Sequence, residues 1–225
     1  LAFTDGKTIL PLESAQDHKA AFDDDKGPNT GGMGAYSPAP IFTDELKKKV
    51  VDEIMIPTVR AMAKEGRYYR GILYAGLMLT ESGPKVLEFN ARFGDPETQP
   101  IMMRIKNDIV PIFEACIDGT LATQTLQWKP ESTVCVVMAA KGYPGSYEKG
   151  NEITGLNLNE NQQAMVFHAG TKLDNGKVLT NGGRVLGVTA LGLNINQAIK
   201  NAYSVVDKIK WDGIHFRKDI GSKAK

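Results

Sequence analysis

Residues 16–40 constrain the fold more than any other part of this 225-residue chain. The segment has almost no hydrophobic periodicity, and it is rich in glycine and proline: Gly27, Gly31, Gly32, Gly34, Pro28, Pro38 and Pro40. Glycine is entropically unfavourable in regular elements and proline lacks an N–H, so this composition argues against a helix or a central strand. Long loops inside compact domains are usually functional or disordered. The segment is therefore predicted to be a surface loop and a candidate site.

Local patterns predict short strands and helices up to residue 120: hairpins at residues 1–12 and 72–89, and helices at residues 43–64, from Asp95-Pro96 onward, and at residues 107–117. Pro57 is expected to kink or split the first helix, and Gly66 to stop it. Asp95 and Asn107 are good N-cap residues for the other two, and Gly119 should end the last.

The second half has a different pattern, beginning after a polar stretch at residues 120–130. Strands are predicted at residues 133–140, 166–172, 178–180 and 184–191, with Asn175-Gly176 as a type I′ hairpin turn. Apolar residues at helical spacing follow over residues 195–209. We therefore predict an α/β (α+β) chain with two domains, residues 1–125 and 126–225.

Composition excludes several classes of partner. The chain has 27 basic and 26 acidic residues with no block of one sign, so neither a nucleic-acid nor a membrane surface is indicated. No apolar run reaches about 18 to 20 residues and no signal peptide opens the chain, which predicts a cytoplasmic protein. Leu1 begins an apparent strand, so we expect an upstream portion to be missing. Cys116 and Cys135 stand in apolar contexts and are interpreted as buried free thiols, with a disulfide the lesser alternative.

The segment 85–97 carries the clearest chemistry. On a strand, Glu88 and Asn90 point to the same face, about 7 Å apart along the chain. A carboxylate and an amide oxygen are hard ligands that suit Mg²⁺, which keeps water and substrate phosphates in its other positions. Arg92 follows in the same parity and is placed to contact phosphoryl oxygens. The alternative is that Glu88 and Asn90 are only the solvent face of an exposed strand.

The strand-to-helix turn after Arg92 contains Asp95, which has two compatible interpretations. It is an N-cap residue by type, and a helix N-terminus also attracts anionic substrates. We interpret Asp95 as a candidate substrate contact.

The second candidate is the glycine loop, residues 27–36. Glycines 31, 32 and 34 permit backbone N–H groups to curl into an anion-binding nest. The loop is not a Walker A motif, and a surface loop without a ligand is the alternative. Asp17, His18 and Lys19 could add charged groups to the same pocket, although such a run is more often solvated surface.

Taken in order, residues 16–19, 27–36 and 87–97 resemble the glycinamide ribonucleotide synthetase family of the ATP-grasp superfamily. Motifs of the second half agree: Lys141-Gly142-Tyr143-Pro144-Gly145, His168-Ala169-Gly170-Thr171, Asn181-Gly182-Gly183-Arg184-Val185-Leu186 and Arg217-Lys218-Asp219-Ile220-Gly221. The likeness covers essentially the whole chain. It implies the carboxy-terminal half of an ATP-grasp domain followed by a small α+β domain.

The resemblance also implies a reaction, in which ATP phosphorylates the carboxylate of glycine and phosphoribosylamine attacks the acyl phosphate. By position, Glu88 and Asn90 become the Mg²⁺ or Mn²⁺ ligands and Arg92 the group that stabilises phosphoryl charge. Glycine and the ribosyl substrate would be held by a larger set: Asp17, Lys19, Asn29, Thr30, Gly31, Gly32, Gly34 and Asp95. A catalytic role for His168 is the lesser alternative to a core or hairpin-end position.

Two departures from the superfamily pattern bear on function. Residues 74–79, on the strand before Glu88, contain no acid where many ATP-grasp enzymes have another metal ligand. The part that supplies the adenine pocket would precede Leu1, so this chain should hold half of an ATP site. A carboxylase-type reaction and a non-catalytic fragment stay open as alternatives. In several eukaryotes the family's domain is fused to other purine-pathway enzymes, and residues 87–97 and 167–171 resemble those versions.

Overall fold

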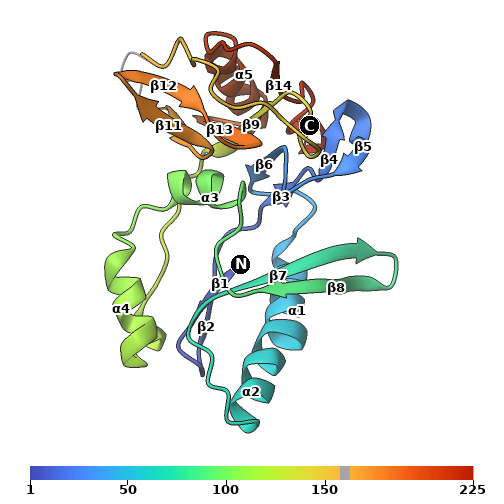
Figure 1. Cartoon of the computed structure of the whole chain (residues 1–225). Coiled ribbons are helices and arrows are strands. Elements are labelled where there is room, and N and C mark those ends of the chain that lie inside the picture. Colours follow the sequence, from blue (N-terminus) through green and yellow to red (C-terminus); the bar gives the residue numbers. More distant parts are fainter. Residues whose placement is uncertain (158–162, 225) are drawn as a thin grey trace. The chain divides into compact units, whose positions relative to one another are not determined.

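The computed structural model describes residues 1–157 and 163–224 (Figure 1). The chain forms two compact units: unit 1 comprises residues 1–14, 40–94 and 105–129, and unit 2 comprises residues 15–39, 95–104 and 130–225. The chain passes from unit 1 to unit 2 for the last time at residues 129–130, and the domain boundary expected near residue 125 stays a prediction. Residues 15–39 and 95–104, which were expected in the first domain, pack in unit 2.

Unit 1 is built on an antiparallel sheet of order β2-β1-β7-β8. Its strands are β1 (Ala2–Thr4), β2 (Ile9–Pro11), β7 (Gly71–Thr80) and β8 (Gly83–Asn90). In the first turn, the Asp5 carboxylate accepts hydrogen bonds from the N–H groups of Lys7 and Thr8 at 3.0 and 2.7 Å. Both predicted hairpins are confirmed.

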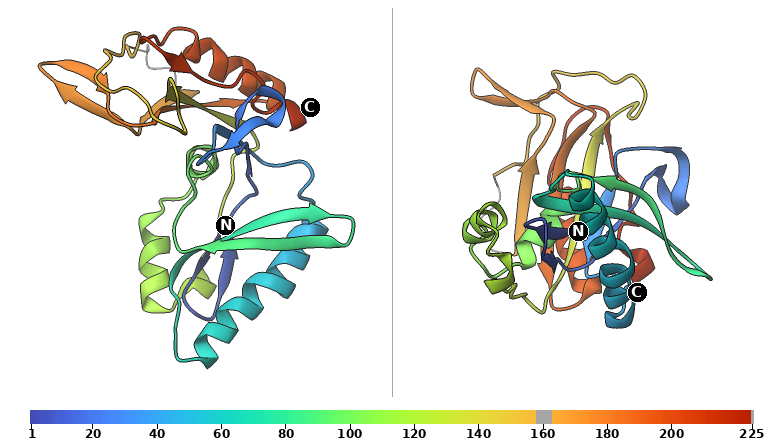
Figure 2. Two further views of the ribbon diagram at one scale, coloured as in Figure 1. Left: turned by 45° about the vertical axis from the view of Figure 1, so that its right-hand side comes forward. Right: turned by 90° about the horizontal axis from the view of Figure 1, so that it is seen from below.

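One nearly continuous helix packs on this sheet: α1 (Asp44–Val50), a π-helical turn η2 (Val51–Met55) and α2 (Ile56–Lys64) (Figure 2). The Thr43 side chain caps its start. The widened turn directly precedes Pro57, which has no N–H to donate, so the predicted interruption takes the form of a π-turn. Val50, Met55 and Val59 pack with Ala2, Leu73 and Ala75 as the core of the unit.

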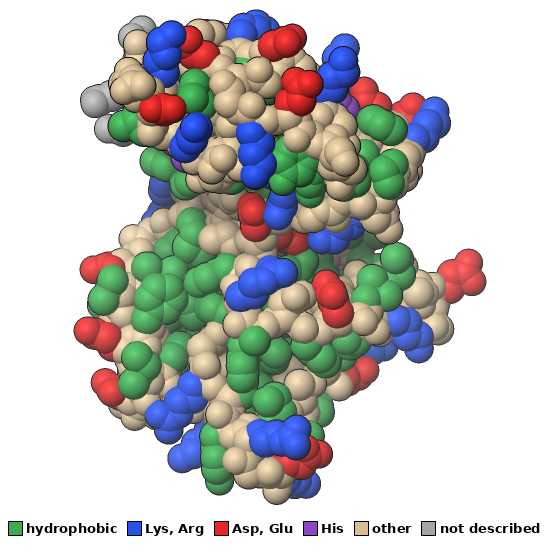
Figure 3. Space-filling view, viewed as in Figure 1, with side chains coloured by type: hydrophobic (Ala, Val, Ile, Leu, Met, Phe, Trp, Pro, Cys, Tyr) green, Lys and Arg blue, Asp and Glu red, His purple; other side chains and the backbone are tan. Residues whose placement is uncertain are grey.

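Helix α4 (Val110–Asp118) follows in unit 1, with the short turn η3 (Leu121–Thr123) after it. The predicted Asn107 cap is wrong, because Asp108 Oδ1 accepts the Val110 N–H at 3.0 Å while Asn107 contacts residues 125 and 127. Gly119 ends α4 in the left-handed conformation, as predicted. Val110, Phe113 and Ile117 stand at helical spacing on α4 and are 54%, 38% and 66% exposed. Figure 3 shows hydrophobic side chains gathered on the surface where this helix lies in Figure 1.

Unit 2 contains a six-stranded sheet whose main order is β10-β13-β9-β6-β3, with β14 also pairing with β9. Its strands are β3 (Gln16–Asp17), β6 (Gly34–Ser37), β9 (Ser132–Ala140), β10 (Ala164–His168), β13 (Arg184–Gly192) and β14 (Ile214–His215). Helices α3 (Thr98–Arg104) and α5 (Ile195–Val206) pack on β9 and β13, which are buried along nearly their whole length.

A separate hairpin, β11 (Thr171–Asp174) and β12 (Lys177–Thr180), also belongs to unit 2. Asn175 and Gly176 both have positive φ, which confirms the type I′ turn. The strand predicted over residues 166–172 is divided between β10 and β11. Cys116 and Cys135 are free and buried, as predicted. The described residues contain no helix with the length and apolar character that a membrane span requires.

The prediction that residues 16–40 form a surface loop is wrong. The segment contains β3, the hairpin β4 (Ala20–Phe22) and β5 (Lys26–Asn29), the turn η1 (Asp23–Asp25) between them, and the fully buried β6. Strand β6 lies between β3 and β9. Its first residue must be glycine, because a Cβ on Gly34 would lie 2.6 Å from the Cys135 carbonyl oxygen and 2.8 Å from Ile220 Cγ2. Glycine here serves close strand packing.

The predicted helix start at Asp95-Pro96 is also wrong. Residues 95–97 form a turn, and α3 begins at Thr98. The Asp95 carboxylate does not cap the helix, because it pairs with Arg184 Nη2 at 3.0 Å and accepts a hydrogen bond from Gln99 Nε2 at 2.8 Å.

We expect Gly34→Ala to lower the free energy of unfolding by about 2–4 kcal/mol, because the added methyl group meets backbone as well as a packed side chain. Gly66→Ala is the matched control. Its Cβ meets open space, and its left-handed φ of +75° accounts for only about 1 kcal/mol. Calorimetric unfolding of both variants tests this, and equal losses would contradict the packing explanation.

Candidate functional site

The predicted metal pair lies on β8 in unit 1. Glu88 and Asn90 share one face, since Asn90 Nδ2 donates a hydrogen bond to Glu88 Oε1 at 3.1 Å. Their cross-strand partners on β7 are Gly76 and Tyr74, so no carboxylate stands opposite, as the sequence indicated. Within the described ranges, no three His, Cys, Asp or Glu side chains cluster in a way that could hold a metal. A carboxylate and an amide oxygen on one face match the donor set of an ion that takes few protein oxygens and completes its shell with water and phosphate.

Arg92 follows this strand and is exposed, with Nη1 donating to the Phe93 carbonyl oxygen at 2.9 Å. The Phe93 ring packs edge-on against Phe3 and Phe113, with ring centroids 6.1 and 6.2 Å away. The backbone next to Arg92 is thus fixed by an aromatic cluster while the guanidinium stays at the surface.

The glycine loop lies in unit 2, and its ordering hydrogen bonds are internal. The Thr30 N–H and hydroxyl both donate to the Lys19 carbonyl oxygen, at 2.7 and 2.8 Å. The Thr30 hydroxyl oxygen accepts the Gly32 N–H at 2.9 Å, and the His18 carbonyl accepts the Met33 N–H at 2.8 Å. Residues 18–19 and 30–33 therefore form one framework.

Arg184 and Tyr143 complete that framework from neighbouring strand ends. The Tyr143 hydroxyl oxygen accepts the Gly31 N–H at 3.0 Å. Arg184 Nη1 donates to the Gly31 and Asp95 carbonyl oxygens at 3.0 and 2.6 Å, in addition to its ion pair with the Asp95 carboxylate. The structure thus brings Asp95 to the loop, as the sequence analysis expected, and does so through an arginine that it had not assigned.

The predicted anion nest is not supported by these contacts. The N–H groups of Gly31, Gly32 and Met33 are all used within the protein, by Tyr143, Thr30 and His18 respectively. The glycines instead allow neighbours to come close: a Cβ on Gly31 would lie 2.8 Å from Arg184 Cζ, and one on Gly32 would lie 2.6 Å from Asp17 Oδ1. The groups available for recognition are therefore side chains.

Asp17 is the most perturbed acid of this group. Its side chain is only 7% exposed, and burial, followed by the nearby Glu97 carboxylate, raises its pKa to about 6. Lys19 Nζ, 2.6 Å from Asp17 Oδ2, opposes this shift. The His18 N–H opposes the shift as well, and no group of the described residues makes a well-aligned hydrogen bond to Asp17 Oδ1. A buried carboxylate with an open oxygen is suited to a cationic or N–H-bearing ligand.

The other sequence candidates lie elsewhere in unit 2. Asn29 is exposed on β5, and Gly34 is buried in the sheet against Cys135 and Ile220. His18 is buried rather than solvated, and its pKa is lowered to about 4 by burial and by the charge of Arg217. His168 is exposed at the end of β10, and its Nδ1 lies 3.1 Å from the Thr171 hydroxyl. This is the hairpin-end position that the sequence offered for His168 as an alternative to a catalytic role.

A fully buried arginine holds the hairpin that leads into the loop. Arg217 donates to the Ala20 carbonyl at 3.2 Å, to Asp25 at 3.0 Å, and through two nitrogens to Asp219 at 2.7 and 2.6 Å. Asp219 also accepts the Asp24 N–H at 3.0 Å. This network ties the turn η1 to the end of the chain, so the loop starts from a fixed hairpin.

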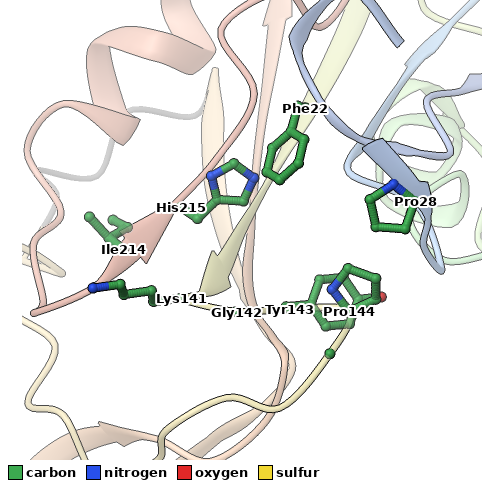
Figure 4. Close-up of a pocket in the computed structure, with 10 residues that line it drawn as sticks. Phe22, Pro28, Lys141, Gly142, Tyr143, Pro144, Ile214 and His215 are labelled. Atoms are coloured by element: carbon green, nitrogen blue, oxygen red, sulfur yellow. The ribbon is translucent and has the colours of Figure 1, made fainter. Parts of the chain in front are cut away.

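Tyr143 also lines a cavity of about 430 Å³ in unit 2 (Figure 4). Its walls include the aromatic and proline rings of Phe22, Pro28, Tyr143, Pro144 and His215. Figure 4 shows the rings of Tyr143 and Pro144 on the side of the close-up nearest to Pro28, which stands two residues before Thr30. The cavity and the glycine loop thus share one side chain.

Sequence reasoning missed Tyr143, Arg184 and Glu97 as site residues. Tyr143 and Arg184 stand in motifs that carried the family resemblance, which was a usable signal. Their juxtaposition depends on the pairing of β9 with β13, where Arg184 lies opposite Ala139 and the Ala140 N–H donates to the Gly183 carbonyl. Spacing in the sequence does not show that pairing.

Two family models match this chain and define the class of protein to which it belongs. The family model described as phosphoribosylglycinamide synthetase, ATP-grasp (A) domain matches residues 1–98, and the C domain model of the same enzyme matches residues 133–223. The first half of the chain is therefore part of an ATP-grasp domain. The chain belongs to the phosphoribosylglycinamide synthetase family.

Individual relatives agree with this assignment. Proteins named phosphoribosylamine–glycine ligase from Rhodopirellula baltica and Pseudomonas aeruginosa are 54% and 52% identical over the whole chain, which covers 52% of each. The crystal structure of that ligase from Thermotoga maritima matches with a TM-score of 0.87 and 37% identity, covering 97% of this chain and 54% of the other. The chain thus spans about half the length of the curated relatives it matches.

More distant structures show the fold alone. The biotin carboxylase domain of Hydrogenobacter thermophilus 2-oxoglutarate carboxylase, solved with MgADP, ADP and bicarbonate, matches with a TM-score of 0.64 at 16% identity. It covers 96% of this chain and 45% of that protein.

We expect Asp17→Asn to stabilise the chain at pH 8. A pKa raised from 3.8 to about 6 means that the folded state holds this proton more tightly than the unfolded state does. Ionisation of Asp17 therefore lowers the free energy of unfolding increasingly from pH 3.8 to 6, and by up to about 3 kcal/mol above pH 6. That cost disappears as the pH falls below 3.8. Thermal unfolding from pH 4 to 8 tests this, with the exposed Asp24→Asn as control. A variant difference that is constant across this range would contradict the assignment.

Proposed function

We propose that the protein containing this chain is an ATP-dependent ligase that joins glycine to 5-phosphoribosylamine in purine biosynthesis. Membership of the family and the names of relatives 52–54% identical support this activity. The observation that carries it is the contact between Glu88 and Asn90 on one face of β8 within the ATP-grasp domain. This oxygen pair is suited to a divalent ion that accompanies ATP.

The reaction proceeds in two steps. A carboxylate oxygen of glycine attacks the γ-phosphorus of ATP, and the bond to the β-phosphate oxygen breaks to give glycyl phosphate and ADP. The amine of phosphoribosylamine then attacks the acyl carbon, phosphate leaves with the C–O electron pair, and the amine loses a proton. In unit 1, Glu88 and Asn90 are the residues that would hold Mg²⁺ or Mn²⁺. When bound, that ion neutralises phosphate charge. Arg92 contributes positive charge toward the transferring phosphoryl group.

The unit 2 framework is assigned to substrate binding. Above pH 6 the Asp17 carboxylate is ionised and offers a buried acceptor that is suited to an amine. Lys19, with its side chain half exposed, and the Asn29 side chain offer groups for anionic and hydroxyl oxygens, while the Thr30 hydroxyl orders the loop that carries them. Asp95 and the peptides of Gly31 and Gly32 set the shape of the loop through Arg184.

A carboxylase-type reaction and a non-catalytic role are the two alternatives to this activity. A carboxylase-type reaction has only fold-level likeness at 16% identity in its favour, and ATP turnover stimulated by bicarbonate instead of glycine would support it. A non-catalytic role for the isolated chain predicts no Mg²⁺-dependent binding of nucleotide or glycine to these 225 residues.

We expect Glu88→Gln to lower glycine-dependent ADP release by about 100-fold or more in the full-length protein, because the substitution removes the one negative charge of the proposed ligand pair. Glu81→Gln, in the exposed turn of the same hairpin, is the matched control and should keep wild-type activity. A coupled ADP assay with varied Mg²⁺ measures both variants. An unchanged rate in Glu88→Gln would remove the metal assignment.

The KM for glycine should rise about tenfold for each pH unit below 6, because protonation of Asp17 removes the negative charge proposed to bind the substrate amine. Steady-state kinetics at constant ionic strength from pH 5 to 8 measures this dependence. In Asp17→Asn the KM should be high at every pH. The same pH slope in that variant would assign the titration to another group.

A further inference from the structure

Tyr143 occupies an unusual position in unit 2, because its ring and its hydroxyl have separate roles. The ring covers Gly183, where a Cβ would lie 2.3 Å from Tyr143 Cδ2 and 3.0 Å from Tyr147 Cε1. The two tyrosine rings meet edge to face, with centroids 6.4 Å apart. Packing against β9 and β13 therefore fixes the direction of the Tyr143 ring.

The hydroxyl at the end of this ring reaches the glycine loop. Its oxygen accepts the Gly31 N–H at 3.0 Å, while Arg184 Nη1 donates to the Gly31 carbonyl at 3.0 Å. Gly31 is thus held on both sides by groups from neighbouring strand ends; we call these two contacts the Gly31 clamp. Gly31 has no side chain and is exposed, so these two hydrogen bonds are the contacts that engage its own N–H and carbonyl directly.

The same hydroxyl keeps its own hydrogen. A phenol can accept and donate at once, and within residues 1–157 and 163–224 the Tyr143 O–H has no acceptor. The hydroxyl contacts Gly31, and Tyr143 also lines the 430 Å³ cavity, where a ligand has room. A donor fixed by its ring, next to the Arg184 guanidinium, is suited to an anionic oxygen.

We propose that Tyr143 is a substrate-positioning residue: its hydroxyl holds Gly31 and donates its hydrogen to a carboxylate or phosphate oxygen of the substrate bound at the glycine loop. This proposal rests on the function proposed above. It assigns a role to the motif of residues 141–145, which the metal pair and Asp17 leave unexplained. Tyr143 does not react; it places the loop and the ligand.

The test compares Tyr143→Phe with Tyr147→Phe in the full-length protein. Both keep the rings that pack on Gly183, and only the first loses a hydroxyl that contacts the loop. We expect Tyr143→Phe to raise the KM for glycine or for phosphoribosylamine about tenfold, with the KM for ATP and the melting temperature unchanged. Tyr147→Phe should match the wild type in all four measurements.

A second measurement follows the clamp without catalysis. Amide hydrogen exchange of peptides covering residues 26–36 should be about tenfold faster in Tyr143→Phe than in Tyr147→Phe. Unchanged KM values for both substrates in Tyr143→Phe, or an equal rise for ATP, would overturn the substrate contact, and unchanged exchange would overturn the clamp. If the wild-type protein shows no glycine-dependent ADP release, both the proposed function and the substrate contact are overturned. The hydrogen-exchange rates of residues 26–36 would still test the Gly31 clamp, because they do not depend on catalysis.

Discussion

Strand β6 enters the sheet of unit 2 beside β9, with Gly34 opposite Val136 and no room for a side chain at position 34. This close backbone approach fixes the glycine loop immediately before it, because Met33 donates to His18 and accepts from Val137 on β9. The loop therefore begins at the Arg217-held hairpin and ends in a buried strand. Both ends are rigid, which explains how a segment with so much glycine can present Asp17 and Lys19 in a defined arrangement.

The two units meet different chemical demands. In unit 1 the groups proposed for metal and phosphate lie on an exposed strand, where they are accessible and their charges are solvated. In unit 2 the proposed substrate groups are partly buried, and the Asp17 carboxylate has a pKa raised to about 6 by burial and by Glu97. Such a carboxylate costs stability when it is ionised, and perturbed acids of this kind concentrate at functional sites.

Residues close in sequence account for most of what could be predicted. Turns such as Asp5-Gly6 and Asn175-Gly176, the strand that carries Glu88 and Asn90, and the helix over residues 195–206 follow from local chemistry, and the structure confirms them. The failures share one cause. By local pattern, residues 16–40 are predicted to be a loop and Asp95 and Asn107 to be helix caps. In the folded protein, residues outside these local patterns bond to their backbone or side chains instead. Those partners are Cys135 for Gly34 and Arg184 for Asp95, and neither is visible to a local pattern.

The sequence by itself determined the family, because the order of its motifs is specific. It also placed Glu88 and Asn90 on one face, because a strand repeats every two residues. Only the tertiary structure decided what the glycines do. The N–H groups of Gly31 and Gly32 are taken by Tyr143 and Thr30, and that of Met33 by His18, so these donors order the loop itself. The physical reason is that a backbone N–H or carbonyl group bonds to the partner that the tertiary structure brings within reach. The pairing of β9 with β13 brings Tyr143 and Arg184 to Gly31.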